Sequence, residues 1–120
     1  MSSRHAIRLK LLEAVSGNSD GESRPVRISE LDKASIHVKA DGSLAFINNV
    51  NVSVRVNSGN TTSPWVQLDI DSNMSLSTSL PEFIIKLTEL DFDELKLTYT
   101  NTTPGAGTFS AYFVAKTVGA

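Results

Sequence analysis

Apolar and polar residues alternate along much of this chain, most clearly within residues 49–70. In the first half of this stretch four valines alternate with Asn, Ser and Arg: Val50, Val52, Val54 and Val56. A period of two is typical of a strand with one buried face and one solvent-exposed face. Residues 65–70 alternate again after a loop rich in Gly, Asn, Ser and Pro, which are turn-forming residues. The stretch therefore predicts a central β-hairpin.

Shorter alternating runs recur on both sides of this hairpin. They occupy residues 5–15, 26–28, 35–40, 74–78, 83–87, 95–100 and 109–115. About eight short strands with no helical pattern between them predict an all-β fold, an antiparallel, jelly-roll-like β-sandwich. The last two runs flank a loop with the sequence Pro-Gly-Ala-Gly, so we expect them to pair as a C-terminal hairpin.

The first run changes phase, because Leu11 and Leu12 are adjacent and both apolar. This indicates either a bulge that switches the face turned to the core, or a strand covered on both faces. A short helix is the alternative, since Leu, Lys, Glu and Ala are good helix formers. We expect the strand.

Residues 16–23 are the most polar part of the chain and contain two glycines but no apolar anchor. They predict a flexible loop or linker between an N-terminal strand or arm at 1–15 and a β-sandwich domain at 24–120. A hairpin loop would keep the first strand in the home sheet, whereas a linker would let the arm cross to a neighbour. We expect crossing, because the arm would otherwise expose apolar surface. The expected partner-binding residues are Ile7, Leu9, Leu11 and Leu12.

Composition limits the class of protein. A length of 120 residues suits one domain, and 40% hydrophobic against 20% charged residues is typical of a globular chain. The chain has no cysteine and no apolar run near the ~20 residues that span a bilayer, and the first residues are charged where a signal peptide is apolar. We expect synthesis in a cytoplasm and no membrane partner.

The charge is divided unevenly, with seven Lys/Arg against five Asp/Glu in residues 1–39 and four against eight in residues 40–120. The net charge is −2. Counted along the chain, this asymmetry is too small for a surface that follows phosphates, so we expect no direct nucleic-acid binding.

Catalytic and metal-binding patterns are weak. Asp69-Ile70-Asp71-Ser72-Asn73 begins like a calcium loop, but the sixth position is Met74 instead of Gly and the twelfth is Leu80 instead of Glu. A second acidic group, Asp91, Asp93 and Glu94, is typical of a solvated bend, with calcium the alternative. The two histidines lack ligand spacing, and no Gly-x-Ser-x-Gly sequence frames a nucleophile. We expect neither catalysis nor a cofactor or metal.

Trp65 is the one residue with two competing interpretations. As the only tryptophan, next to Pro64 at a strand start, it is expected to cap one end of the core. The alternative is an exposed platform on which a sugar ring stacks, with Asn60 and Gln67 supplying hydrogen bonds.

Three segments carry a resemblance to a known group of proteins: Val52–Leu68, Leu95–Asn101 and Phe109–Tyr112. Together they resemble small β-sandwich virion proteins of tailed bacteriophages, in which a V-x-V-x-x-S-x-D-G-x-x-W hairpin precedes an L-R-V-x-x-T strand and a closing G-T strand. The resemblance covers roughly residues 48–116. This chain departs from it at the hairpin tip, which lacks Asp-Gly, and at Lys96, where Arg is commoner.

The resemblance implies a virion structural protein, foremost a capsid decoration (cement) protein on the outer capsid surface that binds the major capsid protein, and it brings no catalytic residues. A carbohydrate- or receptor-binding module of a phage tail or fibre is the alternative. Open sandwich edges with few guarding prolines favour a homo-oligomer, and capsid lattices, which offer threefold positions, favour a trimer over a dimer.

Overall fold

The computed structural model describes residues 4–28, 31, 33–42, 47–58, 61–62, 64–68, 74–77, 79–87 and 92–118. All regular elements within these ranges are strands: β1 (Arg4–Ser16), β2 (Gly21–Glu22), β3 (Val26–Arg27), β4 (Lys33–Ala40), β5 (Ile47–Arg55), β6 (Asn57–Ser58), β7 (Thr61–Thr62), β8 (Val66–Gln67), β9 (Met74–Leu76), β10 (Glu82–Leu87), β11 (Glu94–Thr103) and β12 (Thr108–Val118). Nowhere in the described ranges is there a helix long and apolar enough to cross a membrane.

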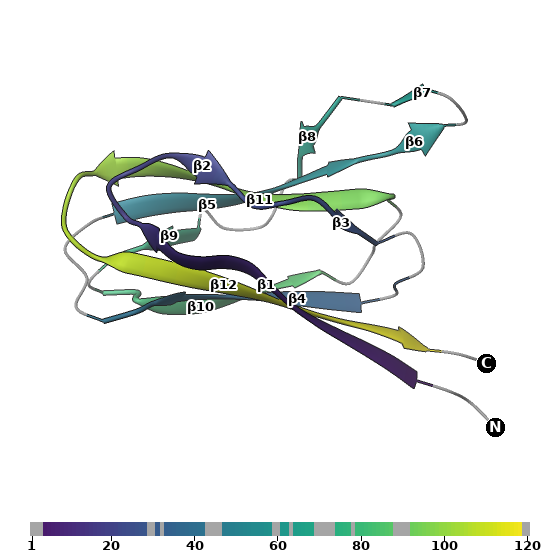
Figure 1. Cartoon of the computed structure of the whole chain (residues 1–120), viewed down its shortest axis with the longest axis horizontal. Helices are drawn as coiled ribbons and strands as arrows, with labels where there is room; N and C mark the ends of the chain where they lie inside the picture. The colour runs from purple at the N-terminus through teal and green to yellow at the C-terminus, as the bar shows by residue number, and fades with distance from the viewer. Residues whose placement is uncertain are drawn as a thin grey trace.

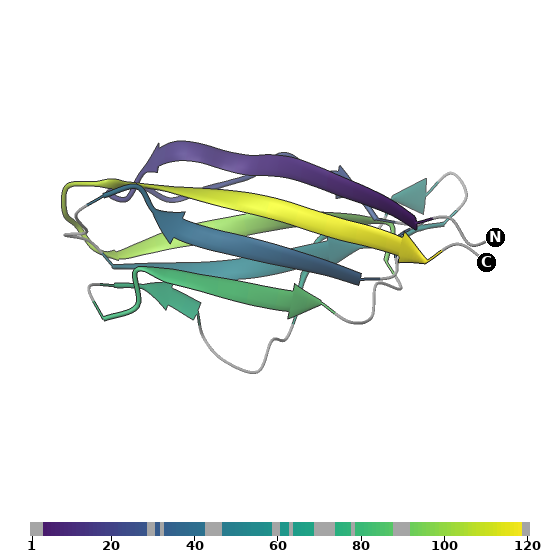
Figure 2. The ribbon, with the colours of Figure 1, turned by 90° about the horizontal axis from the view of Figure 1, so that it is seen from below.

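Two antiparallel sheets pack face to face, as Figure 1 shows edge-on. The first sheet has the order β1-β12-β4-β10, and its four strands lie side by side in Figure 2. In the second, β11 lies between β5 and the short strands β2 and β3, while β8 and β9 pair with the other edge of β5. The predicted central hairpin is confirmed by the pairing of β5 with β8, and β6 and β7 extend it beyond the sheet.

The strand order of the two sheets resembles that of a jelly roll. If β2 with β3 and β8 with β9 count as two interrupted strands, the eight main strands are ordered 1-8-3-6 in one sheet and 2-7-4-5 in the other. Consecutive strands therefore mostly alternate between sheets, which is a jelly-roll-like order. The all-β antiparallel sandwich predicted from the sequence is confirmed.

The predicted C-terminal hairpin is wrong, because β11 lies in the second sheet and β12 in the first. The loop at 104–107 crosses from one sheet to the other instead of reversing within one sheet. Alternation had indicated correctly that both strands bury one face. They bury those faces against each other across the core, and Tyr99 on β11 meets Phe109 on β12 edge to face, with ring centres 5.1 Å apart.

In this single chain β1 belongs to the home sheet and pairs with β12 along its length, from Arg4 opposite Val118 to Ser16 opposite Thr108. Of the two alternatives for Leu11 and Leu12, the structure shows the bulge, with register shifts between Lys10 and Leu12 and between Leu12 and Val15. Ala14 takes a positive φ of 46° there, and its N–H donates to the buried Ser110 hydroxyl at 3.0 Å. Residues 17–20 then turn the chain toward β2.

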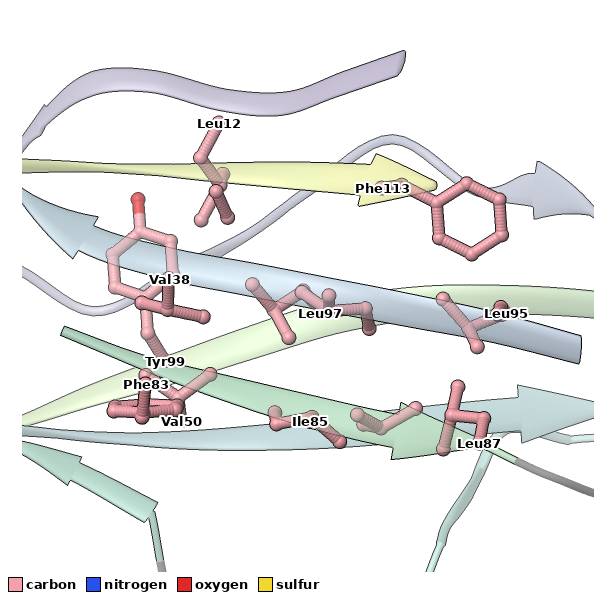
Figure 3. Close-up of a cluster of buried hydrophobic side chains, with 14 of the residues drawn as sticks. Leu12, Val38, Val50, Phe83, Ile85, Leu87, Leu95, Leu97, Tyr99 and Phe113 are labelled. Atoms are coloured by element: carbon pink, nitrogen blue, oxygen red, sulfur yellow. The ribbon is translucent and has the colours of Figure 1, made fainter. Parts of the chain in front are cut away.

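The core lies between the sheets and is built from the alternate residues of each main strand that point inward. Inward side chains of β4, β10 and β12 meet those of β5 and β11, as Figure 3 shows, and the largest fully buried ones include Phe109, Phe113, Ile36, Leu95 and Leu97. Phe92, in the acidic bend before β11, is partly buried and packs against the core.

Candidate interaction surfaces

Of the four residues predicted to bind a partner, Ile7, Leu9 and Leu11 line one groove, whereas Leu12 is buried. Ile7 and Leu9 lie opposite the inward-facing residues Ala115 and Phe113, so they are on the inward side of β1. After the bulge, Leu12 takes the inward side, opposite Ala111. Leu12 is buried in the home core, and Leu11 is packed partly against it. Ile7 and Leu9 remain 37% and 42% exposed, because β1 and β12 run past the second sheet toward the termini (Figure 1).

Ile7, Leu9 and Leu11 line a groove of about 530 Å³ at one side of the sandwich. The opposite wall comes from the other sheet's edge and consists of residues 24–27, which include β3. Arg24 and Arg27 therefore flank an apolar floor. Within the described strands β1 pairs on one side only, so its other edge presents backbone N–H and C=O groups beside this groove. The arrangement suits an apolar side chain or an added strand from another chain.

Trp65 does not cap the core, so the core-capping interpretation is wrong. Val66 lies opposite Val54, an inward residue, and the alternation of a strand therefore turns both Trp65 and Gln67 outward. The Trp65 ring covers the outer face of the second sheet. The Arg55 guanidinium carbon and the Lys96 ammonium nitrogen each lie 4.5 Å from its centre.

The cations around Trp65 are held in ion pairs. Glu94 Oε1 accepts from Arg55 Nε at 3.0 Å and lies 3.0 Å from its terminal nitrogen, while Lys96 Nζ donates to Glu22 at 2.9 Å. The Lys96 side chain is only 12% exposed although it stands on an outward face. The indole ring and these ion pairs therefore form a covered polar cluster, and at least one ring face is already occupied by protein cations.

The predicted glycan platform is brought together in part. Gln67 shares the outward face with Trp65, and its amide nitrogen donates to Asn51 Oδ1 at 3.2 Å. Asn60 lies outside the described residues. Sequence reasoning missed Arg55, Lys96 and Glu94 as neighbours of Trp65, because only the β5–β11 register places them side by side. The sequence did indicate that these three residues occupy the polar, outward positions of their strands.

A second groove of about 370 Å³ lies beside β8, and Arg55 and Gln67 are among its lining residues. Its walls are mainly apolar and include Val54, Val56, Pro64, Leu68 and Phe92. Val66, also in its wall, is 60% exposed. The edge beside β8 therefore carries exposed apolar surface as well.

The residues considered for chemistry are dispersed. His37 Nε2 lies 3.2 Å from Glu82 Oε1, without the alignment of a hydrogen bond. In the part of the chain that the structure describes, no three His, Cys, Asp or Glu side chains gather as metal ligands would. The candidate calcium residues Asp69, Asp71 and Asp91 lie outside that part, as does His5 in its side chain.

No protein-family model matches the chain, and no curated protein matches its sequence significantly. Solved structures share its fold. The SPBc2 prophage-derived protein YomS superposes with a TM-score of 0.56 at 6% identity over 96% of each chain. The infectious bursal disease virus VP2 subviral particle gives 0.56 at 11% identity, covering 97% of this chain and 33% of VP2. This chain thus spans about a third of VP2, and at these identities the likeness concerns the fold alone.

Proposed function

We propose that this protein is a bacteriophage virion structural protein, and specifically a decoration protein that binds the assembled capsid shell. Binding is its whole activity in this proposal. Three lines of support converge: the sandwich is shared along almost the whole of both chains with a prophage-derived protein, it is shared with a viral capsid protein, and the sequence resembles small phage virion proteins. Such a protein works by covering surface at subunit junctions.

The observation that carries the proposal is the groove beside β1. It combines exposed Ile7 and Leu9, a long strand with one unpaired edge, and flanking arginines at Arg24 and Arg27. Unpaired, apolar strand edges are avoided on free monomers because they invite pairing with other chains. A capsid subunit, or a neighbouring copy of this chain in a trimer, would cover this edge.

The test is binding to purified heads of the phage that carries this gene, with the decoration site empty. Wild-type protein should co-sediment at stoichiometric copy number. The double variant Ile7→Glu and Leu9→Glu should lose binding while keeping the wild-type circular dichroism spectrum, since both side chains lie outside the buried core. Leu80→Glu is the matched control, because Leu80 is similarly exposed but lies in the turn between β9 and β10. Wild-type protein that stays in the supernatant would remove the proposal.

A carbohydrate- or receptor-binding module is the second candidate, favoured by one observation: the only tryptophan lies on an outer face beside amide side chains instead of in the core. A glycan array combined with titration of Trp65 fluorescence tests it. Saturable quenching by a glycan that Trp65→Ala abolishes would favour this function. Unchanged fluorescence with every glycan would end it, as the ring contacts of Arg55 and Lys96 lead us to expect.

A further inference from the structure

The outward face of the first sheet holds more than half of the chain's cations. Because inward neighbours on each strand fill the core, the alternate positions of β1, β4, β10 and β12 share one outer surface. Six of the eleven Lys and Arg residues stand on it: Arg8, Lys10, Lys33, Lys39, Lys86 and Lys116. We call this surface the basic face, and Figure 2 shows its four strands side by side.

The register arranges the basic face as an apolar centre with a charged rim. One row across the four strands reads Lys10, Tyr112, His37 and Ile84, and the next reads Arg8, Val114, Ser35 and Lys86. Ile84 is 52% exposed, and Lys10 Nζ stands 5.8 Å from the centre of the Tyr112 ring. Tyr112 and Val114 on the inner strand β12 thus form an apolar middle, and the exposed Ile84 stands at the β10 edge of the face. An apolar middle with a charged rim is the anatomy of a protein interface.

The basic face carries a net positive charge, although the chain as a whole is negative. Its acidic neighbours among the described residues are Glu13, Asp41 and Glu82, so six cations minus three anions gives +3. The whole chain carries a net charge of −2. A chain that is acidic overall therefore concentrates positive charge on one flat sheet surface. The hydrogen-bonded Glu13 carboxylate raises the pKa of Lys10.

The outer face of the second sheet provides an internal comparison. There, Arg55 is paired with Glu94 and Lys96 with Glu22. On the basic face, five of the six cations have no ion-pair partner within the described part of the chain, Lys10 being the exception. Lys33 and Lys116 even stand directly opposite each other, and like charges in that position destabilise a strand pair. The repulsion between these cations falls when an anionic surface binds over them.

We infer that the basic face is a docking surface for an acidic protein surface, with Tyr112 and Val114 at its centre and Ile84 at its β10 edge. The inference deepens the proposed decoration function and rests on it for the identity of the partner, an acidic region of the capsid shell. Charge complementarity argues for carboxylates opposite the rim. The apolar residues favour a protein over a nucleic acid, because phosphates gain nothing from contact with Ile84 and Val114.

The basic face is also continuous with the groove beside β1. Arg8 and Lys10 alternate along β1 with Ile7 and Leu9, and Lys10, whose ammonium stands near the Tyr112 ring, is also one of the residues that line the groove. A partner wrapped around the β1 edge would therefore contact apolar residues on one side and cations on the other.

The test uses the full chain carrying Lys33→Gln, Lys86→Gln and Lys116→Gln, which removes three positive charges from the basic face. A matched control, Asn18→Asp, Thr100→Glu and Thr103→Glu, makes the same change in net charge at exposed positions off the basic face. Each protein is titrated with three probes: purified heads, poly-L-glutamate, and oligothymidylate of the same charge. Titrations at about 50 mM and about 200 mM NaCl measure the electrostatic part of the binding free energy, because the screening length shortens as the salt concentration rises.

We expect wild type and control to bind heads and poly-L-glutamate more weakly at the higher salt. The triple lysine variant should bind both about tenfold more weakly at low salt and lose most of its salt dependence. Tyr112→Ser should weaken binding to heads at both salt concentrations, because a central aromatic contributes by packing. Amide chemical shifts on addition of poly-L-glutamate should change on β4, β10 and β12.

Three results would overturn the inference: equal binding of the triple variant and wild type, a tenfold preference for oligothymidylate through the same residues, or loss of self-association in the triple variant before any probe is added. The last two would assign the basic face to nucleic acid or to a second copy of this chain. If wild type ignores heads yet binds poly-L-glutamate through these lysines, the decoration proposal fails and the docking surface stands.

Discussion

Replacing Asn48 with leucine should make the protein more stable. Asn48 lies on β5, opposite Asn101 of β11 and Leu76 of β9, and its side chain turns into the core. It is fully buried, and among the described residues neither Oδ1 nor Nδ2 has a hydrogen-bond partner. An amide in this position loses its bonds to water on folding and recovers none.

The size of the effect follows from this burial. An unsatisfied buried polar group costs about 1–3 kcal/mol, and Leu has nearly the shape of Asn without the polar atoms. We therefore expect Asn48→Leu to raise the free energy of unfolding by about 1–3 kcal/mol. For a domain of this length the entropy of unfolding is roughly 0.25 kcal/mol per kelvin, so Tm should rise by about 4–12 °C.

Thermal and urea unfolding, followed by circular dichroism, measure the change, and an unchanged urea m value would show that the surface exposed on unfolding is the same. Asn49→Leu is the matched control, because Asn49 is the next residue on β5 but faces outward and accepts a hydrogen bond from Ser75. The control should give no gain. A lower Tm for Asn48→Leu would refute the reasoning and show that the native amide is satisfied, for example by a buried water.

Three further changes test the packing. Gly21→Ala should cost about 1–3 kcal/mol in urea unfolding, because the added methyl would overlap the Tyr99 hydroxyl and lie 2.7 Å from the ring carbon bearing it; an unchanged midpoint would contradict this close contact. Ser110→Ala should cost about 1–3 kcal/mol and speed exchange of the Ala14 amide, since the hydroxyl accepts from that N–H and donates to Asp41 at 2.8 Å. Trp65→Ala should cost only about 1–2 kcal/mol, from two cation–π contacts; a loss of 3 kcal/mol or more, typical of a core tryptophan, would place the ring in the core.

The sequence predicted which residues are buried better than which strands are neighbours. Alternation placed four valines on one buried face, and three of them, Val50, Val52 and Val54, are buried, whereas Val56 beyond the end of β5 is 43% exposed. The phase change at Leu11 indicated a bulge as one of two alternatives, because both features depend on local geometry. The C-terminal hairpin was wrong for a physical reason. Alternation reports the face that a strand buries, and it is the same whether the next strand pairs with it or packs across the core.

The candidate surfaces show the same limit. The outward position of Trp65 follows from its parity with Gln67, but only once the pairing of Val66 with Val54 fixes which side is inward. Charge counted along the chain also concealed the basic face. Arg8, Lys33 and Lys116 are far apart in sequence and stand on one surface only because β1, β12 and β4 are adjacent.

The most direct test of the decoration function is the copy number and position of the protein on heads, determined by cryo-electron microscopy after purified protein is added to undecorated particles. We expect regular density at junctions between capsid subunits, with the β1 edge and the basic face against the shell, and no such density with the Ile7→Glu and Leu9→Glu variant. Heads that stay bare at saturating wild-type protein would contradict it.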